Sequence, residues 1–196
     1  SNDYLNMALN YLAPEAPRLI AVGGLSGSGK SRMARELAPF LGVAPGARVV
    51  RSDSTRKRLA GVPLTRRLGN QGYLAEMTER TFEALYEEAL AALRAGQSVL
   101  ADAVFAKPES RRAIERVADK AGVPFTGLWL EAPAEIMAQR VTERQRNVSD
   151  ADAKILGQQL TYDLGEIEWF RIDSSGPRQE TLKVGLGLIG LETGVA

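Results

Sequence analysis

One eight-residue stretch near the beginning of the chain has residue types and spacing suited to binding phosphate. It follows the pattern G-x-x-x-x-G-K-[ST], and its residues are Gly24, Leu25, Ser26, Gly27, Ser28, Gly29, Lys30 and Ser31. Glycine lets the backbone turn its amides inward, where together with the N-terminus of the next helix they form an anion site. Lys30 adds a positive charge for the β- and γ-phosphates, and the Ser31 hydroxyl suits Mg²⁺. This P-loop therefore predicts a site for ATP and Mg²⁺ that extends to Arg32; the alternative is a glycine-rich turn that holds no ligand.

Two aspartates, each at the end of a short apolar run, could supply the carboxylates of a phosphate-transfer site. Asp102 follows Val99-Leu100-Ala101 and is suited to be a second partner of Mg²⁺ that also faces the substrate. The alternative is a carboxylate that caps a turn. Asp53 follows Val49-Val50-Arg51-Ser52 and could accept the proton of a substrate hydroxyl. The alternative for Asp53 is the N-cap of the next helix.

The chain contains no histidine and no cysteine. A general base must therefore be a carboxylate or a lysine. Catalytic metal sites built on histidine or cysteine, disulfides and thiol chemistry are all excluded.

Charge is strongly segregated in one segment. Between positions 51 and 67 a single acid, Asp53, accompanies six cations, which are Arg51, Arg56, Lys57, Arg58, Arg66 and Arg67. This segment predicts an anionic acceptor molecule, and the alternative is a solvated helix face. Arg56 lies three residues after Asp53 and can point toward the same crevice.

Further arginines lie on the helix expected after the fourth strand. Arg140 and Arg144 are four residues apart and share a face of that helix. They could close over a transferring phosphoryl group as an arginine finger does, with Arg140 as an ATP contact and Arg144 as a catalytic residue. The alternative is a salt-bridged surface helix, because Glu143 lies between them.

The apolar pattern predicts elements that would bring these groups together. Strands expected over 18–23, 47–52, 98–101, 125–130 and 167–172 alternate with helices, which indicates an α/β fold with a parallel sheet flanked by helices. The helices are expected from the P-loop to about 41, after Asp53, and over 75–94, 108–121, 133–146, 149–163 (with a Ser149/Asp152 capping box) and 179–189. Ligands bind at the carboxyl ends of such strands, so Lys30, Asp53 and Asp102 should line one crevice.

Composition limits the classes of partner. The chain has 196 residues, of which 44% are hydrophobic and 25% charged, as expected for one globular domain. The net charge of +1 gives no global field that would favour nucleic acid or a membrane surface. No stretch approaches the roughly 18 apolar residues of a membrane span. We expect a cytoplasmic protein whose partners are ATP and a small molecule, without nucleic acid or membrane.

The beginning of the chain is expected to stand apart from the domain. Ser1-Asn2 resembles a tag remnant, and apolar residues spaced as on one helical face predict a short linker helix over 4–12. The expected division is residues 1–17 as tag remnant and linker helix, and residues 18–196 as the phosphate-binding domain.

The motifs together resemble a known family. The strings GLSGSGKS, VVRSDxxRKRLAG, VLADAVFxKPESRR and LWLEAP, followed by an arginine-rich helix, are similar to the AAA_33-type P-loop kinases. These are related to the 5′-kinase domain of phage polynucleotide kinase and, more distantly, to gluconate kinase and zeta toxins. The chain also resembles the C-terminal half of bacterial two-part proteins whose N-terminal half is similar to aminoglycoside phosphotransferases, so such an upstream domain is an expected partner.

The resemblance implies a nucleoside-monophosphate-kinase-like P-loop NTPase fold with a five-stranded parallel sheet in the order 2-3-1-4-5. Lys30 and Ser31 match the ATP·Mg²⁺ residues of the family. Asp53 matches the general base of the polynucleotide kinase, and Arg56 matches its acceptor-phosphate arginine. Asp102 matches the carboxylate after strand three, and Arg144 matches the lid arginine.

The sequence thus predicts an ATP-dependent phosphotransferase that acts on a hydroxyl of a small, anionic acceptor. The alternative is an ATP-binding regulatory module, or slow ATPase, that controls a fused or partner domain. A module of that kind needs no base, and the presence of Asp53 and Arg56 favours the enzyme.

Overall fold

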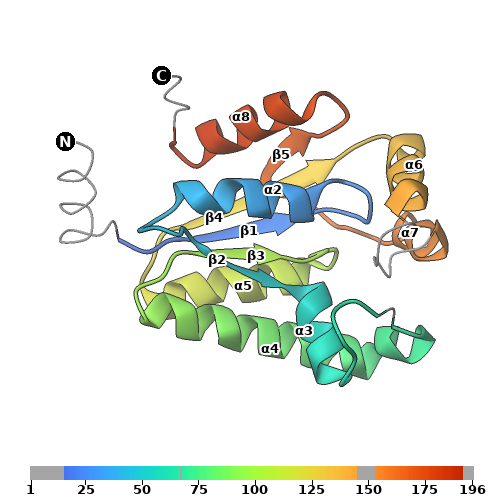
Figure 1. Ribbon diagram of the computed structural model, residues 1–196, viewed down its shortest axis with the longest axis horizontal. Helices are drawn as coiled ribbons and strands as arrows, with labels where there is room; N and C mark the ends of the chain where they lie inside the picture. Colours follow the sequence, from blue (N-terminus) through green and yellow to red (C-terminus); the bar gives the residue numbers. More distant parts are fainter. Residues whose placement is uncertain (1–15, 67, 145–152, 192–196) are drawn as a thin grey trace.

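A five-stranded parallel sheet runs through the computed structural model, which describes residues 16–66, 68–144 and 153–191 (Figure 1). The strands lie in the order β2-β3-β1-β4-β5, and every neighbouring pair is parallel. Their bounds are β1 Leu19–Gly23, β2 Arg48–Arg51, β3 Val99–Asp102, β4 Phe125–Glu131 and β5 Phe170–Asp173. The predicted fold class and strand order are confirmed.

The central strands are apolar because both faces of the sheet are covered. Every residue of β1 and of β3 is buried, whereas edge strand β2 begins and ends with an arginine. This is the pattern expected where helices cover both sides of a parallel sheet.

Two pairs of helices cover the two faces of the sheet. On one face, α2 (Lys30–Leu37) and α8 (Arg178–Leu188) pack against Ile20 and its neighbours. On the other face, α4 (Ala75–Arg94) and α5 (Pro108–Ala121) pack against Leu19 and Ala21. The strands β1 and β3 lie side by side, yet the helices that follow them cover opposite faces. A crevice forms at the carboxyl ends of two such strands.

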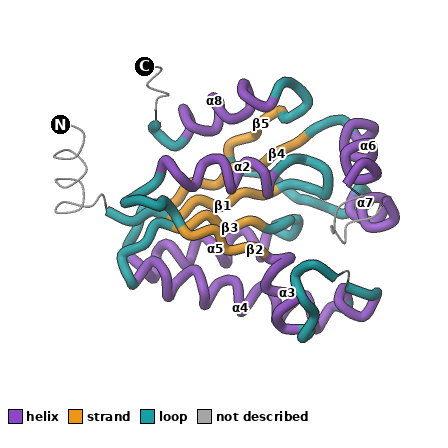
Figure 2. The backbone as a smooth tube through the Cα atoms, viewed as in Figure 1, coloured by secondary structure: helices purple, strands orange, loops and turns teal. Residues whose placement is uncertain are grey.

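Other helices gather at that carboxyl edge (Figure 2). They are α3 (Ser52–Leu59), the 3-10 turn η2 (Asn70–Tyr73), α6 (Ala134–Arg144) and α7 (Ala153–Gln159). Both α6 and α7 contribute to a small apolar cluster with Leu25 of the P-loop, so the P-loop packs directly against them.

Several predicted bounds need correction. The helix after the P-loop ends at Leu37 and continues as the 3-10 turn η1 (Ala38–Phe40), because Pro39 has no N–H for a further helical bond. The fifth strand begins at Phe170, three residues later than predicted, because Ile167 and Trp169 pack into the core on the α4/α5 face. Helix α7 ends at Gln159 and does not reach 163. The predicted linker helix over 4–12 and the Ser149/Asp152 capping box lie outside the described residues.

Candidate functional site

The P-loop connects β1 to α2 and depends on glycine at two close approaches. Gly27 has a φ of 84°, and a side chain there would collide with the backbone of Met137 in α6. Gly24 has a φ of 137°, and a side chain there would collide with the carbonyl oxygen of Leu130. The N–H of Gly24 donates to Val104, just after β3, which fixes the start of the loop. Helix α2 begins at Lys30 with its first N–H groups directed at the loop, as an anion site requires.

A cleft of about 670 Å³ opens beside the P-loop at the carboxyl ends of β1, β2 and β3. Its lining includes three predicted groups from separate parts of the chain, Lys30, Asp53 and Asp102. The further lining residues are Ser26, Gly27, Ser31, Arg32, Arg35, Arg51, Ser52, Ser54, Arg56, Leu64, Tyr73, Ile155 and Gln159. The predicted crevice is therefore present, and five of the cofactor-binding candidates face it, namely Ser26, Gly27, Lys30, Ser31 and Arg32.

The other P-loop candidates face elsewhere. The side chain of Leu25 is buried in the cluster with α6 and α7, and Ser28 is fully buried. Gly29 lines a separate, narrow pocket on the far side of the P-loop. Any contact of Leu25 or Ser28 with a ligand would therefore come from the backbone.

Asp102 is almost completely buried at the end of β3, and Arg51 holds it. The Arg51 Nε donates to Asp102 Oδ2 at 3.1 Å. The two residues are direct partners in the β2–β3 ladder, so strand register alone brings them together. Sequence reasoning missed this pairing, because the register of two strands 50 residues apart is not visible in a local pattern.

Asp53 lies in the first turn of α3 with its side chain 41% exposed. The N-cap of this helix is Arg51, and no side chain caps the helix end, so the predicted capping alternative is wrong. The carboxylate instead lies 3.7 Å from the Nζ of Lys57, one helical turn further along. That lysine is 1% exposed and also donates to the carbonyl oxygen of Leu64 at 3.2 Å. Lys57 therefore ties Asp53 to the loop that forms one wall of the cleft.

Arg56 is also buried, although part of it lines the cleft. Its Nη1 donates to the carbonyl oxygen of Gly72 at 2.7 Å and to Thr78 Oγ1 at 3.1 Å, and its guanidinium lies 5.2 Å from the centre of the Tyr73 ring. Burial lowers the pKa of Arg56, and the charges of Tyr73 and Asp53 oppose that shift. Arg56 thus joins α3 to the start of α4 while it faces the cleft.

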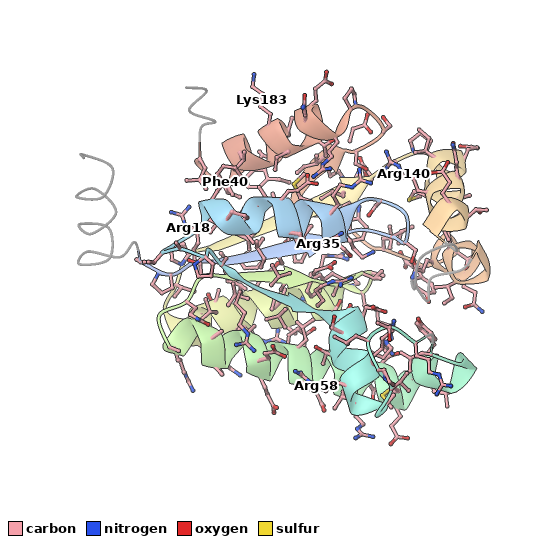
Figure 3. All side chains as sticks on the ribbon, viewed as in Figure 1. Arg18, Arg35, Phe40, Arg58, Arg140 and Lys183 are labelled. Carbon is pink, nitrogen blue, oxygen red and sulfur yellow. The ribbon has the colours of Figure 1, made fainter. Side chains whose placement is uncertain are left out.

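The basic segment is consequently not one surface. Arg51, Arg56 and Lys57 have partners within the site, whereas Arg58 lies on the outer side of α3 and pairs with Glu88 of α4 (Figure 3). Arg66 is exposed, and Arg67 lies outside the described residues. The alternative of a solvated helix face is wrong for Arg56 and Lys57, which are buried.

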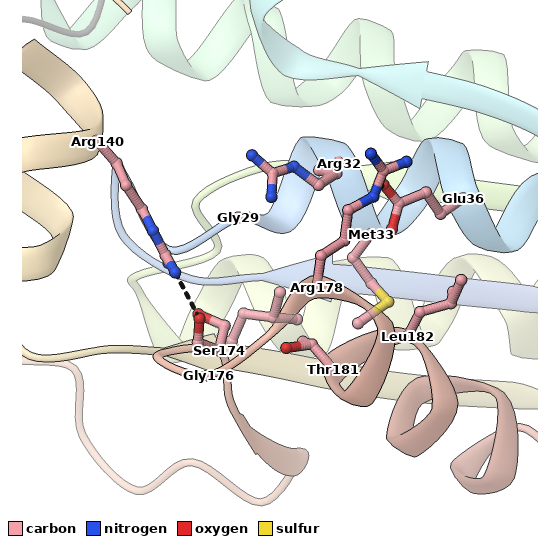
Figure 4. Close-up of a pocket in the computed structure, with 11 residues that line it drawn as sticks. Gly29, Arg32, Met33, Glu36, Arg140, Ser174, Gly176, Arg178, Thr181 and Leu182 are labelled. Carbon is pink, nitrogen blue, oxygen red and sulfur yellow. Dashed lines mark hydrogen bonds and ion pairs between the residues drawn. The ribbon is translucent and has the colours of Figure 1, made fainter. Parts of the chain in front are cut away.

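Arg140 reaches from α6 toward the P-loop and the turn after β5 (Figure 4). Its Nη2 donates to the carbonyl oxygen of Ser174 at 2.7 Å, and its Nη1 lies 3.5 Å from the carbonyl oxygen of Gly27. Ser174 in turn donates its hydroxyl to the carbonyl oxygen of Ser28 at 2.7 Å. Arg140 and Ser174 border the narrow pocket, whose further lining residues are Gly29, Arg32, Met33, Glu36, Leu130, Gly176, Arg178, Thr181 and Leu182. Arg144 is the last residue of α6, and its side chain lies outside the described residues.

Arg111 holds the surroundings of the site together and was not predicted. This guanidinium, 4% exposed, donates to the carbonyl oxygens of Phe105 and Ala106 after β3. It also donates to the carbonyl oxygens of Leu164 and Glu166, in the segment that follows α7. Burial lowers the pKa of Arg111, and the negative charges of nearby glutamates partly offset this shift. Arg111 therefore joins the segment after β3, which holds Gly24, to the segment that carries α7.

Two further observations limit the chemistry. Among the described residues, no three carboxylates lie close enough to form a metal cage, so a divalent ion would depend on a bound phosphate for part of its coordination. None of the helices formed by these residues is long and apolar enough to span a membrane.

The family is shown by comparison with known proteins. The model of the AAA_33 family, described as an AAA domain, matches residues 19–162. The chain belongs to this family. With its sheet order and P-loop it has the fold of the P-loop kinases, as the sequence motifs predicted.

Individual relatives agree with this class. An uncharacterized protein of Mycobacterium tuberculosis is 31% identical over 189 residues; the match covers 91% of this chain but 36% of the relative, so the chain spans about a third of that relative's length. An adenylyl-sulfate kinase of Myxococcus xanthus is 30% identical over 117 residues, which cover 60% of this chain and 59% of the relative. The structure of an APS kinase of M. tuberculosis in complex with AMPPNP and APS has a TM-score of 0.66 and 20% identity, and the match covers 89% of this chain and 98% of that one.

Proposed function

We propose that this chain is an ATP-dependent phosphotransferase that moves the γ-phosphoryl group to a hydroxyl of a small anionic acceptor. The observation that carries the proposal is one cleft that contains the P-loop lysine, Lys30, and two carboxylates, Asp53 and Asp102. The 30% identity to an adenylyl-sulfate kinase supports phosphate transfer as the reaction class.

In this proposal Asp53 is the general base. Its carboxylate is partly exposed in the cleft, so a substrate hydroxyl can reach it and give up its proton there. Lys57 holds the carboxylate in place from the buried side. Lys30 would neutralise charge on the γ-phosphoryl group as it moves to the acceptor oxygen.

Mg²⁺ fits the residues beside the P-loop. The hydroxyl of Ser31 and the carboxylate of Asp102 are hard oxygen ligands that line the same cleft, and Arg51 binds one of the two carboxylate oxygens of Asp102. When bound, the ion would supply charge neutralisation to the phosphates.

We assign the base of the nucleotide to the narrow pocket on the other side of the P-loop, which has a volume of about 30 Å³ in this structure and must widen to admit a base. Arg32 and Arg140 border it, and Gly29 connects it to the phosphate site (Figure 4). We assign Arg140 to ATP binding on this basis. Arg144, one helical turn further along α6, is proposed from its spacing to close over the transferring phosphoryl group.

The acceptor would lie against the opposite wall of the cleft. Arg51 and Arg56 give this part of the cleft a positive charge, and Leu64 and Tyr73 add apolar surface. Positive charge near the candidate base favours an acceptor that carries a phosphate, sulfate or carboxylate group.

We also propose that the chain is part of a longer protein, with residues 18–196 as its kinase domain and residues 1–17 as a linker helix and tag remnant. The match to about a third of the M. tuberculosis relative supports a further domain. An upstream domain similar to aminoglycoside phosphotransferases remains our proposal for that partner.

A transfer assay tests the function. The chain is incubated with γ-labelled ATP, MgCl₂ and a panel of sugars, nucleosides, sugar phosphates, aminoglycosides and 5′-hydroxyl oligonucleotides, and labelled products are separated. We expect label on a small anionic acceptor and ATP loss that depends on that acceptor. ATP loss that no acceptor increases would contradict the proposal and favour a regulatory ATP-binding module.

A further inference from the structure

A glutamine from α7 contacts the P-loop directly. The Oε1 of Gln159 accepts the N–H of Ser26 at 2.7 Å, across a separation of 133 residues. The two residues are 7% and 5% exposed. Both also line the cleft beside Gly27 and Lys30, so this buried contact lies at the wall of the proposed phosphate site.

The backbone of the P-loop fixes which way the Gln159 amide points. An N–H group can be accepted only by the amide oxygen, so the NH₂ group must point away from Ser26. In the part of the chain that the structure describes, this NH₂ group has no acceptor. The nitrogen is not one of the buried polar atoms without a partner, so it reaches the open cleft, where a ligand with acceptor oxygens can meet its two N–H groups.

The position of Gln159 indicates which part of a nucleotide would supply that acceptor. The narrow pocket, to which we assign the base, lies on the other side of the P-loop and does not include Gln159. The cleft holds Lys30, which suits the β- and γ-phosphates, and Asp53, the proposed base. The terminal phosphate must lie between these two groups for transfer to occur, in the cleft that Gln159 lines.

We propose that Gln159 binds the terminal phosphoryl group of ATP through its amide N–H groups while its oxygen holds the P-loop at Ser26. This inference rests on the proposed function. Because the side chain of Gln159 would contact both the P-loop and the terminal phosphate, binding of a triphosphate would also link α7 to the P-loop.

The test separates the donor from the structural contact by replacing Gln159 with glutamate. Gln159→Glu keeps an oxygen that can accept the Ser26 N–H but replaces the NH₂ group with a second, negatively charged oxygen. Gln158→Glu is the matched control, since it makes the same change on the same helix at an exposed position outside the cleft. Calorimetry would measure binding of ADP and of the β,γ-imido analogue of ATP, each with MgCl₂.

We expect Gln159→Glu to weaken binding of the analogue by about ten- to a hundredfold, as for loss of a hydrogen bond to a charged group. Binding of ADP should change by less than about threefold, and Gln158→Glu should change neither, since its side chain is exposed and does not line the cleft. Equal weakening of ADP and analogue, or no change in either, would overturn the role of Gln159 while leaving the proposed function intact. Absence of nucleotide binding by the unmodified chain would overturn both.

Discussion

The two walls of the cleft are built in different ways. The phosphate wall, residues 24–32, is held through its own backbone: the N–H of Gly24 donates to Val104, Gly27 packs on Met137, and the side chains of Ser174 and Gln159 bond to backbone groups of Ser28 and Ser26. The acceptor wall, residues 51–57 with 64–66 and 68–73, is held by charged side chains that bind across elements, such as Arg51 of β2 on Asp102 of β3 and Lys57 of α3 on the carbonyl oxygen of Leu64. A backbone site binds any phosphate chain of the right shape, whereas a side-chain site can be tuned to one acceptor. The structure therefore separates the general part of the proposed reaction from the specific part.

The largest effect is expected on the phosphate wall. Lys30→Ala should remove most of the rise in melting temperature that MgATP causes, because the unmodified chain gains stability only through binding to its folded state. At about 100 times the Kd that gain is about 2.7 kcal/mol. Differential scanning fluorimetry with and without MgATP measures it, and Lys120→Ala, at an exposed position of α5, is the control. A full MgATP shift in Lys30→Ala would show that the nucleotide binds elsewhere.

A smaller effect is expected on the acceptor wall, and it should leave the phosphate wall unchanged. Lys57→Met keeps a long buried side chain but removes the ammonium that contacts Asp53 and the carbonyl oxygen of Leu64. Loss of a hydrogen bond worth about 0.5–1.5 kcal/mol should lower kcat/KM for the acceptor by about two- to tenfold. The KM for ATP should not change.

The control for this variant is Arg58→Met, since Arg58 is 60% exposed on the outer side of α3. It should leave kcat/KM for the acceptor within about twofold, as is usual for an exposed ion pair. An equal loss in both variants, or a KM for ATP that rises in Lys57→Met, would mean that the two walls are not independent.

The smallest effect concerns the scaffold of the acceptor wall in acid. Glu88 of α4 accepts from Arg48 of β2 and Arg58 of α3. Its burial raises its pKa, but the hydrogen bonds and charges of the two arginines outweigh this and lower the pKa below its ordinary value of 4.5. The resulting stability is present above that ordinary value and is lost as the pH falls through the lower folded value.

Urea unfolding checks this expectation. At neutral pH, Glu88→Gln should be about 0.5–1 kcal/mol less stable than the unmodified chain, the usual range for a mostly exposed ion pair. The difference should shrink as the pH falls through the lowered folded pKa of Glu88 and vanish once Glu88 is protonated in both states of the unmodified chain. A difference that persists in acid would assign the effect to packing.

The same contrast explains how much the sequence could predict. The P-loop was predictable because it is a contiguous pattern. The helices over Ala75–Arg94 and Pro108–Ala121 were predicted with the bounds that the structure has, because Gly96, Pro108 and Gly122 mark their ends. The acceptor wall was predicted only as a list of charges. In the sequence, Lys57 belongs to a basic run that predicts a surface residue, and only the tertiary fold buries it.

The residues that sequence reasoning missed share one property. The partners of Arg111 in the segment after α7 lie 53 and 55 residues away, and that of Gln159 lies 133 residues away. A local pattern carries no record of such contacts, because they depend on where whole elements pack. Arg111 and Gln159 both connect the region of α7 to the surroundings of the P-loop, so this connection could be found only in the structure.

The central claim is that Asp53 receives the proton of the acceptor hydroxyl. Asp53→Asn keeps the shape of the side chain, and since Asp53 does not cap α3, folding and ATP affinity should change little. The measurement is single-turnover transfer from γ-labelled ATP to the acceptor at saturating nucleotide, in Asp53→Asn and the unmodified chain. The account predicts a rate about 10²- to 10⁴-fold lower in the variant, the usual contribution of a general base. Transfer within a few-fold of the unmodified rate would contradict the account and make Asp102 the leading candidate base.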